Sequence, residues 1–319
     1  MSQTPNLCRV CQSGFGRTFQ REGTPYGVCA TCKCINKVLT EREYFDLGAT
    51  YDPGQVMSVE DERLVREYLS VDEHKALLQS ILPRLHLAGR APQLLDVGCG
   101  MGGYLLAGRE LGFEVQGVEP SQSHSEIGRT AFNLPIVTDY FGRGLFGDRR
   151  FDIVILSHVI EHIYDPKTFL DDVAEIVAPG GVIMLRTPNA QSNLAALTGS
   201  RWSMLVPLDH VTMMAPESLR RLTPAGFGLT LETQEQVWEP AVVILQALKG
   251  VLTKRAQSST SAAAAAPDGA TRNSFRSTYV KINGNPLVKL LLSLASLPIW
   301  TVDQGLGRGH CLQAIYQRQ

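Results

Sequence analysis

Residues 94–103 constrain this chain more than any other part of its sequence. They run Leu-Leu-Asp-Val-Gly-Cys-Gly-Met-Gly-Gly, and a helix-like segment at 104–111 follows at once. This pattern predicts a strand, a tight turn and a helix. Glycine suits such a turn because it accepts positive φ and lets a ligand approach the backbone. The helix N-terminus offers unpaired N–H groups to a polar or anionic group. We therefore expect a nucleotide-like cofactor at this turn.

The glycines alone leave the cofactor open. Gly98, Gly100 and Gly103 also fit the G-x-G-x-x-G spacing of nicotinamide- and flavin-binding folds. With either cofactor, an acidic residue after the next strand binds the ribose hydroxyls, and Glu119 occupies that place. Asp96, directly before the first glycine turn, together with the segments after Glu119, favours one of these cofactors. The array Asp-x-Gly-x-Gly-x-Gly that it opens resembles motif I of the class I S-adenosylmethionine-dependent methyltransferases.

This resemblance implies a set of cofactor contacts. Asp96 and the glycines would shape the site for the methionine end of S-adenosylmethionine, and Glu119 would bind the ribose. Asp139, after the third strand, would meet the adenine amino group. The cofactor-binding residues that the resemblance implies are Asp96, Gly98, Gly100, Gly102, Glu119, Asp139 and Ser157.

Strand and helix signals alternate along the rest of this region. Ser121 suits the N-cap of a helix to about residue 131, and Asp165 with Pro166 opens another to about residue 177. Apolar runs without interruption are typical of buried parallel strands. Further strands are expected at 115–119, 136–138, 151–156, 182–186, 227–237 and 311–316. The predicted fold is α/β, a doubly wound and mostly parallel seven-stranded sheet. The resemblance implies that it is of the class I methyltransferase, Rossmann-like kind, in which the last two strands pair as an antiparallel hairpin.

The segment after the fourth strand, Ser-His-Val-Ile-Glu-His, lies at the edge where ligands bind in open sheets. With its neighbours it resembles the family that includes the ubiquinone-biosynthesis O-methyltransferases, over about residues 70–230. That family has Glu-x-x-Glu-His here, implicated in divalent-metal binding, whereas this chain has His158 in the first position. His158, Glu161 and His162 could still bind a metal, or Glu161 and His162 could form a hydrogen-bonded pair that fixes the loop.

Two histidines are candidates for catalysis. A neutral imidazole at His158 can take a proton from a substrate hydroxyl near pH 7, or it can position the substrate as a donor. Trp202 and His210 precede the helix at 216–222, and this arrangement resembles the family region in which an aromatic residue and a histidine line the acceptor pocket. His210 is the second candidate base, with a structural loop histidine as the alternative.

Five of the seven cysteines lie in the first 34 residues. Cys8 and Cys11, and then Cys29 and Cys32, form two C-x2-C knuckles that can present four thiolates to one tetrahedral Zn²⁺. Cys34 could replace Cys32 as a ligand. Disulfides are the competing interpretation, which a cytoplasmic chain disfavours. Four thiolates leave no open coordination position, so we expect a structural site.

The composition limits the partners and the location. A formal net charge of −1 predicts no general nucleic-acid partner. Residues 1–30 lack the apolar core of a signal peptide, and the longest apolar stretch, 290–302, is shorter than the roughly 20 residues of a membrane span. We expect a cytoplasmic protein.

The organisation is predicted as five segments. Residues 41–90 are charged and helix-like, and leucines and an isoleucine within 72–87 recur at helical spacing. About seventy residues separate the last two predicted strands and are expected to form an insertion. It contains helix-like residues 241–254, a low-complexity tract at 257–273 and an apolar helix at 287–299. The segments are a zinc-ribbon-like segment at 1–40, a helical linker and cofactor cover at 41–90, a methyltransferase core at 91–239, the helical insertion at 240–308 and the final core strand at 309–319.

The helices of the insertion have several alternative roles. They could form a lid over the acceptor pocket, or a surface for peripheral contact with a membrane or a lipid-linked substrate. Dimerisation or burial against the core accounts for their apolar residues equally well.

A cysteine ribbon fused to this kind of catalytic domain resembles a group of bacterial methyltransferases associated with sugars, polysaccharides and natural products. The expected function is methyl transfer from S-adenosylmethionine to a hydroxyl oxygen of a small-molecule or glycan acceptor. The alternatives are an NAD(P)-dependent oxidoreductase, and a non-catalytic protein that binds S-adenosylmethionine or acts as a zinc-ribbon scaffold.

Overall fold

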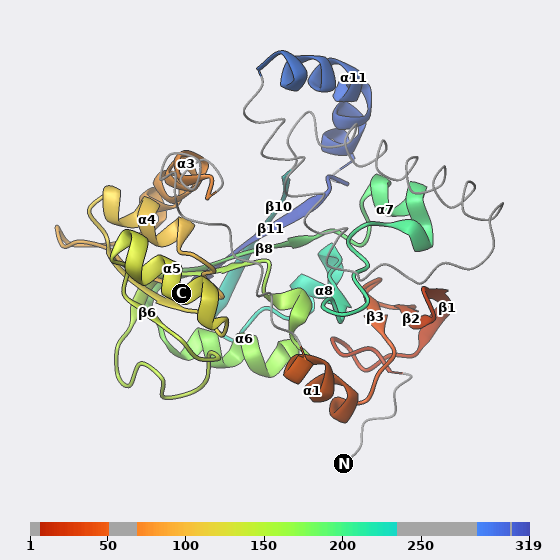
Figure 1. The fold of residues 1–319 in the computed structure, drawn as a ribbon, viewed down its shortest axis with the longest axis horizontal. Coiled ribbons are helices and arrows are strands. Elements are labelled where there is room, and N and C mark those ends of the chain that lie inside the picture. The colour runs from red at the N-terminus through yellow and green to blue at the C-terminus, as the bar shows by residue number, and fades with distance from the viewer. Residues whose placement is uncertain (1–6, 51–68, 235–285, 307) are drawn as a thin grey trace. The chain divides into compact units, whose positions relative to one another are not determined.

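The computed structural model describes residues 7–50, 69–234, 286–306 and 308–319 (Figure 1). The chain divides into two compact units. The first consists of Met1–Gln191, Val206–Glu232 and Cys311–Gln319, and the second of Ser192–Leu205 and Thr233–His310. The glycine turn, both candidate catalytic histidines and the five N-terminal cysteines all belong to the first unit.

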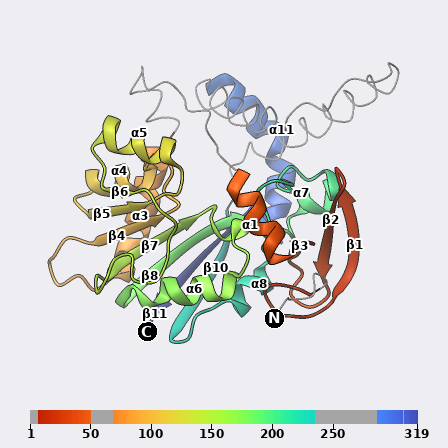
Figure 2. The same cartoon turned by 60° about the horizontal axis from the view of Figure 1, so that its bottom comes forward.

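A seven-stranded sheet forms the centre of the first unit, in the order β10-β11-β8-β7-β4-β5-β6 (Figures 1 and 2). The β4–β5, β5–β6, β4–β7 and β7–β8 pairs are parallel, and β11 is antiparallel to β8. The predicted mostly parallel, doubly wound sheet is confirmed. Its strands are β4 (Gln93–Val97), β5 (Glu114–Val118), β6 (Ile136–Val137), β7 (Phe151–Ser157), β8 (Val177–Pro188), β10 (Phe227–Gln234) and β11 (Cys311–Arg318).

Strand β8 begins five residues earlier than its apolar core suggests. The sequence predicts this strand over 182–186, but Pro179, Gly180 and Gly181, which precede that apolar run, also lie inside β8. Phe151 still pairs with Val177, and the register shifts before Ile153. Gly180 has φ of 73° there, so the glycines form an irregularity within the strand, as in a β-bulge, rather than ending it.

Helices cover both faces of the sheet because its strands are apolar at successive positions. Leu94, Ile153 and Met184 belong to one buried cluster, with residues of α3, α4 and α5. Their neighbours in the chain, such as Leu95 and Val154, belong to a second cluster with residues of α6 and α8. Alternate side chains of a strand point to opposite faces, so both faces are buried. These helices are α3 (Val71–Ile81), α4 (Gly103–Glu110), α5 (Gln122–Phe132), α6 (Pro166–Glu175) and α8 (Pro216–Arg221).

Helices α5 and α6 begin at the N-cap residues that the sequence predicts, Ser121 and Asp165. The Ser121 hydroxyl accepts from the His124 backbone N–H at 3.4 Å, and the Asp165 carboxylate accepts from the Thr168 N–H at 3.2 Å. Pro166 occupies the first turn of α6, where its missing N–H costs nothing.

The N-terminal cover helix is shorter than predicted. Helix α3 (Val71–Ile81) gives way to a short 3₁₀ turn, Leu82–Arg84, instead of continuing to residue 87. Pro83 has no backbone N–H and its ring clashes with the preceding turn, which explains the end of the helix. Leu78 and Ile81 are fully buried in the same cluster as α4. Helix α1 (Glu41–Thr50) precedes it in the chain.

The N-terminal segment forms a four-stranded sheet that a later part of the chain completes. Its strands are β1 (Phe15–Arg21), β2 (Thr24–Cys29), β3 (Ile35–Lys37) and β9 (Thr212–Met213), in that order. All three strand pairs are antiparallel. The predicted ribbon therefore shares a sheet with the segment that follows His210.

The second unit contains α7 (Asn193–Thr198) and α11 (Pro286–Gly305). The predicted apolar helix at 287–299 lies within α11 and includes Pro298. Four of its leucines, Leu287, Leu290, Leu291 and Leu294, are more than half exposed. The predicted helix at 241–254 and the tract at 257–273 lie outside the described residues. Within the described part of the chain, no helix combines the length and apolar character needed to cross a membrane.

Replacing Leu78 with alanine tests the packing of α3. The change removes a fully buried side chain, and we expect it to lower the free energy of unfolding by about 2–5 kcal/mol. The partly buried neighbour Leu77 is the matched control, and Leu77→Ala should cost clearly less. Urea unfolding followed by circular dichroism measures both. Equal losses in the two variants would contradict the assigned face of α3.

Candidate active site

The glycine turn lies between the end of β4 and the start of α4. It is fixed to the neighbouring strand, because the Gly98 and Cys99 N–H groups both donate to the Val118 carbonyl oxygen, at 2.8 and 3.2 Å. Gly102 has φ of 92°, and a Cβ added there would lie 2.4 Å from Leu134. Gly100 also has positive φ, but its missing Cβ points into open space. The turn therefore needs glycine at position 102 and leaves room for a ligand at position 100.

Two buried carboxylates lie at this turn. Asp96 is 3% exposed and Glu119 is 8% exposed. Glu119 accepts hydrogen bonds from the Gly100 N–H at 2.8 Å and from the Ser121 N–H at 2.9 Å, which fix its orientation. Burial, together with the charge of Glu119, raises the pKa of Asp96 well above its usual value. The turn is thus an acidic environment that a cationic group would stabilise.

The other two residues predicted to contact the cofactor lie at the same edge of the sheet. Asp139 is exposed just after β6, and its carboxylate accepts from the Tyr140 N–H at 2.7 Å. Ser157 ends β7 and is half-buried. Because parallel strands end at one edge, β4, β5, β6 and β7 deliver these residues to the side of the sheet where ligands bind in such folds.

His158 follows β7 directly and has an unusual backbone. Its φ is 59°, a left-handed conformation that is uncommon outside glycine and costs of the order of 1–3 kcal/mol. Its N–H donates to the Arg186 carbonyl oxygen at 2.8 Å. The imidazole is half exposed, and Nδ1 lies 3.0 Å from Oε1 of Glu161. Residues held in such conformations cluster at functional sites.

Glu161 is the buried centre of this region. Its side chain has no exposed surface, and its second oxygen accepts from the Thr187 hydroxyl at 3.0 Å. Burial alone would raise the pKa of Glu161. The His158 hydrogen bond and the charges of His158, His162 and His210 outweigh burial and lower the pKa to about 2. Because the Glu161 carboxylate can only accept, Nδ1 of His158 carries a proton, and in the neutral imidazole Nε2 then has the lone pair.

A second acid–histidine pair lies beside the first. Nδ1 of His162 lies 2.6 Å from the Asp209 carboxylate, and the His162 and His210 rings meet edge to face with centroids 4.8 Å apart. His210 is nearly buried. Ligand atoms of Glu161, His162 and His210 all lie within 4.8 Å of one another, a spacing that could hold a metal ion. The structure thus brings His210 to the Glu161 carboxylate, whereas Trp202 is fully buried in the second unit.

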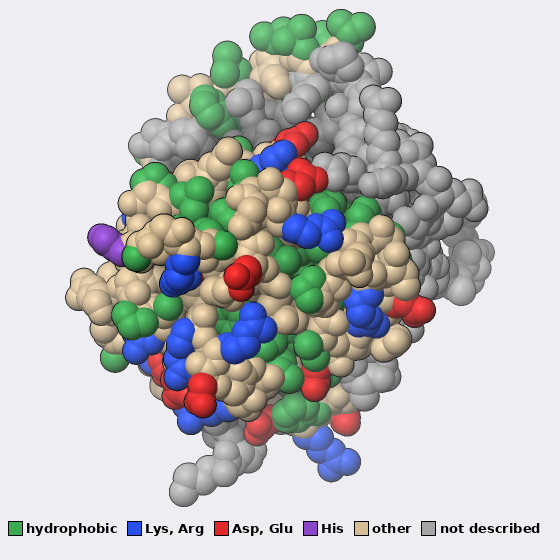
Figure 3. Space-filling view, turned by 90° about the vertical axis from the view of Figure 1, so that its left-hand side faces the viewer, with side chains coloured by type: hydrophobic (Ala, Val, Ile, Leu, Met, Phe, Trp, Pro, Cys, Tyr) green, Lys and Arg blue, Asp and Glu red, His purple; other side chains and the backbone are tan. Residues whose placement is uncertain are grey.

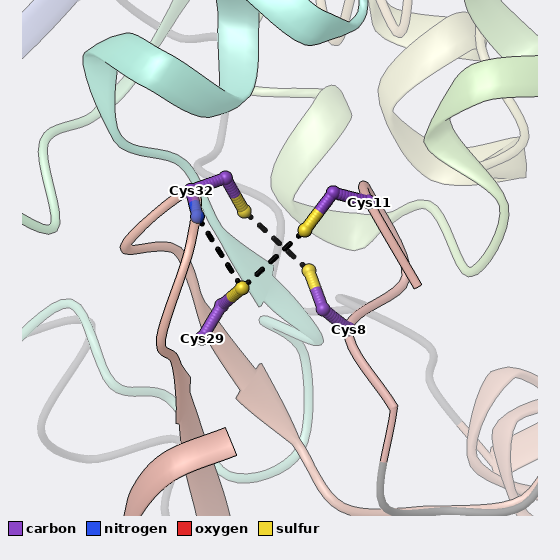
Figure 4. Close-up of side chains that lie close together, drawn as sticks. All are labelled: Cys8, Cys11, Cys29 and Cys32. Carbon is purple, nitrogen blue, oxygen red and sulfur yellow. Dashed lines mark hydrogen bonds between the residues drawn. The ribbon is translucent and has the colours of Figure 1, made fainter. Parts of the chain in front are cut away.

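The two cysteine knuckles meet, as their spacing predicts. The sulfurs of Cys8, Cys11, Cys29 and Cys32 point toward one another and lie within 4.8 Å (Figure 4). All seven cysteines are free thiols. Backbone N–H groups of Val10, Thr31 and Cys32 approach the knuckle sulfurs at 3.4 Å. Cys34 is also buried, with its sulfur 3.3 Å from that of Cys8 and 3.2 Å from that of Cys32. The four thiols at ligand spacing include Cys32 as the fourth member.

Charge is mixed on the face drawn in Figure 3. Among the described residues of that face, Lys and Arg side chains alternate with Asp and Glu side chains and with apolar ones. This arrangement lacks the single-sign patch that binds nucleic acid.

Three residues of the site were missed by the sequence analysis. Thr187 holds Glu161, Asp209 holds His162, and Arg9 reaches the backbone after His210. Asp209 directly precedes His210 in the chain, and an acidic residue next to a candidate base was the only sequence signal that could have identified Asp209. Thr187 and Arg9 had no local signal, because their partners are 26 and 202 residues away.

Comparison with known proteins gives a consistent match over this region. A family model described as "Methyltransferase domain" matches residues 67–234, just over half of the chain. A ubiquinone biosynthesis O-methyltransferase of Rhizobium leguminosarum bv. trifolii (strain WSM2304) is 30% identical over 155 residues, which cover 44% of this chain and 61% of that protein. The ubiquinone biosynthesis O-methyltransferase of Rhizobium johnstonii is 31% identical over 153 residues, which cover 44% of this chain and 62% of that protein.

The chain thus spans about six tenths of the length of these curated relatives. Among solved structures, a SAM-dependent methyltransferase from Archaeoglobus fulgidus aligns with a TM-score of 0.47 at 18% identity, covering 78% of this chain and 94% of that one.

The pKa of Glu161 sets a pH dependence of stability. Because the folded-state value of about 2 lies below the ordinary 4.5, the unfolded chain binds the proton first as pH falls. The stabilisation from Glu161 is therefore complete above about pH 4.5 and disappears as the pH falls toward 2. Glu161→Gln should flatten this acid limb in urea unfolding midpoints, whereas Glu126→Gln, on an exposed residue of α5, should not. An unchanged limb in Glu161→Gln would contradict the buried, ionised carboxylate.

Proposed function

The chain belongs to the methyltransferase-domain family, and from that premise we propose that it is an S-adenosylmethionine-dependent methyltransferase acting on a hydroxyl oxygen. Asp96, Glu119 and the glycines at 98, 100 and 102 would hold the cofactor, with Ser157 and Asp139 at the same sheet edge. Bound there, S-adenosylmethionine supplies an electrophilic methyl group.

The acidic character of the glycine turn is the observation that carries this proposal. S-adenosylmethionine brings an ammonium group and a sulfonium, and both would be stabilised by the buried carboxylates of Asp96 and Glu119. A nicotinamide dinucleotide would bring an anionic pyrophosphate to the same turn, where the two carboxyl groups offer no positive charge and would be disfavoured further in their ionised forms. The charge of the site thus favours methyl transfer over the alternative NAD(P)-dependent oxidoreductase.

His158 is the proposed general base. The Glu161 carboxylate holds its Nδ1, so Nε2 is free to take the proton of an acceptor hydroxyl. The charge of Glu161 also stabilises the imidazolium that results. His210, close to the same carboxylate, is the second candidate and would position the acceptor or share the proton. This arrangement favours an enzyme over a non-catalytic binding module.

The acceptor is proposed to be a small molecule or a glycan with a free hydroxyl group. The relatives named as ubiquinone biosynthesis O-methyltransferases support transfer to oxygen on a small molecule. A glycan acceptor rests on the resemblance of the ribbon and catalytic domain to methyltransferases of sugars. Peripheral contact with a membrane or a lipid-linked acceptor would use the exposed leucines of α11.

The cysteine cluster is proposed to hold a structural Zn²⁺. Cys8, Cys11, Cys29 and Cys32 supply four thiols at ligand spacing, and zinc sites with four thiolates are closed to substrate. The backbone N–H groups directed at the sulfurs would stabilise the thiolate charge, as partners around a metal site do.

Substitution of His158 tests the function. Asparagine tolerates positive φ, so His158→Asn removes the base while keeping the backbone. We expect kcat to fall about 10²–10⁴-fold, the usual contribution of a general base, with unchanged affinity for S-adenosylhomocysteine. The measurement is transfer of labelled methyl from S-adenosylmethionine to a panel of catechols, phenols and methyl glycosides. His86→Asn, on an exposed histidine, is the control, and His210→Asn separates the two candidates. Full activity in His158→Asn would remove it as the base.

A further inference from the structure

We propose that the cysteine ribbon is part of the acceptor side of the active site, and that Arg9 is the residue through which it positions the segment carrying Asp209 and His210. This inference rests on the proposed function, but its geometry does not depend on which acceptor is methylated. It gives the ribbon a role in placing the catalytic histidines, beyond that of a separate metal-binding module.

The peptide groups of Val211 join the two sides. The Val211 N–H donates to the Glu161 carbonyl oxygen at 2.8 Å, which ties the segment to the loop of the candidate base. The Val211 carbonyl oxygen accepts from the Lys37 N–H at 2.9 Å and from the Arg9 guanidinium at 3.2 Å, which ties it to the ribbon. Val211 directly follows His210, so its position fixes where that imidazole can lie.

Arg9 is held from several directions. It is 9% exposed, and its guanidinium also donates to the carbonyl oxygens of Lys37 at 2.9 Å and Leu39 at 3.2 Å. The same group lies 4.7 Å from the ring centre of Tyr164, two residues after His162. A planar guanidinium can donate to several carbonyl oxygens and stack on an aromatic ring at the same time, which a lysine ammonium cannot do.

Strand pairing reinforces this link. Ile35 pairs with Met213 and Asn36 with Thr212, so β3 and β9 lie side by side as neighbouring strands. The Lys37 ammonium also donates to the Pro207 carbonyl oxygen. The ribbon therefore contacts the segment on both sides of Asp209 and His210. A segment with so little regular structure of its own depends on these contacts for its conformation.

The cysteine cluster connects to Arg9 through one side chain. Asn36 accepts from the Arg9 N–H at 3.1 Å and donates to the Cys34 sulfur at 3.2 Å. Cys8, in the same cluster, precedes Arg9 in the chain. A metal held by the cysteines would thus fix the backbone from which Arg9 extends. The residues proposed to bind the cofactor are positioned by β4 and β5 instead of by the ribbon. Loss of Arg9 should therefore affect only the histidines proposed to face the acceptor.

Histidine NMR on the full-length protein tests this role without an acceptor. The chain has seven histidines, and ¹³C-labelled imidazoles give one signal each, assigned by single His→Asn variants. Arg9→Ala and the milder Arg9→Lys should shift or broaden the His162 and His210 signals and leave His86 and His124 unchanged. Arg17→Ala, on an exposed residue of β1, is the matched control.

Three further readouts make the result specific. Both Arg9 variants should retain zinc at the wild-type ratio by elemental analysis and bind S-adenosylhomocysteine with unchanged affinity by calorimetry. Their kcat should fall by up to about 100-fold, since a displacement of the order of 1 Å can cost that much.

Unchanged His162 and His210 signals in both Arg9 variants would overturn the proposal. Movement of all seven signals would overturn it too, because Arg9 would then support the whole fold. The NMR shifts do not depend on turnover, so they test the positioning role of Arg9 even if the proposed methyl transfer is wrong. Calorimetry with S-adenosylhomocysteine tests the proposed methyltransferase function separately.

Discussion

The buried carboxylate of Glu161 is the interaction on which the candidate site depends. An ionised group without solvent contact is costly unless it is paired and hydrogen-bonded. Here Thr187 and His158 bond its two oxygens, and the charges of His162 and His210 lie near it. These four residues come from three parts of the chain: Thr187 from the end of β8, His158 and His162 from the loop after β7, and His210 from the segment before β9. One charge therefore explains why three segments converge at the edge of the sheet.

The same edge separates two chemical environments. Around the glycine turn, the buried carboxyl groups of Asp96 and Glu119 form an acidic environment in which the pKa of Asp96 is raised, and a cationic donor would favour their ionised forms. Around Glu161, histidines surround a carboxylate whose pKa is lowered to about 2, suited to taking a proton from an acceptor. The strands β4 and β5 carry the first environment and β7 and β8 the second. Methyl transfer needs both, a donor held by acids and an acceptor next to a base.

Much of the first unit could be predicted from local patterns. The apolar strands, the Ser121 and Asp165 caps, the glycine turn and the two cysteine knuckles all depend on residues close in the chain, and the structure contains them. Errors arose where backbone chemistry overrode periodicity, as when Pro83 ended α3 early. Contacts across long separations had no signal at all. The pairing of β3 with β9 and the reach of Arg9 to Val211 join residues that only the tertiary fold brings together.

Calorimetric titration of the purified protein with S-adenosylhomocysteine, and separately with NADH, tests the central claim most directly. The account predicts binding of S-adenosylhomocysteine alone. Glu119→Ala should weaken it by about tenfold or more, at least 1.4 kcal/mol, while the exposed control Glu114→Ala should leave it unchanged. Binding of NADH without S-adenosylhomocysteine would contradict the account, because the acidic turn would then hold the cofactor that its charge is inferred to exclude.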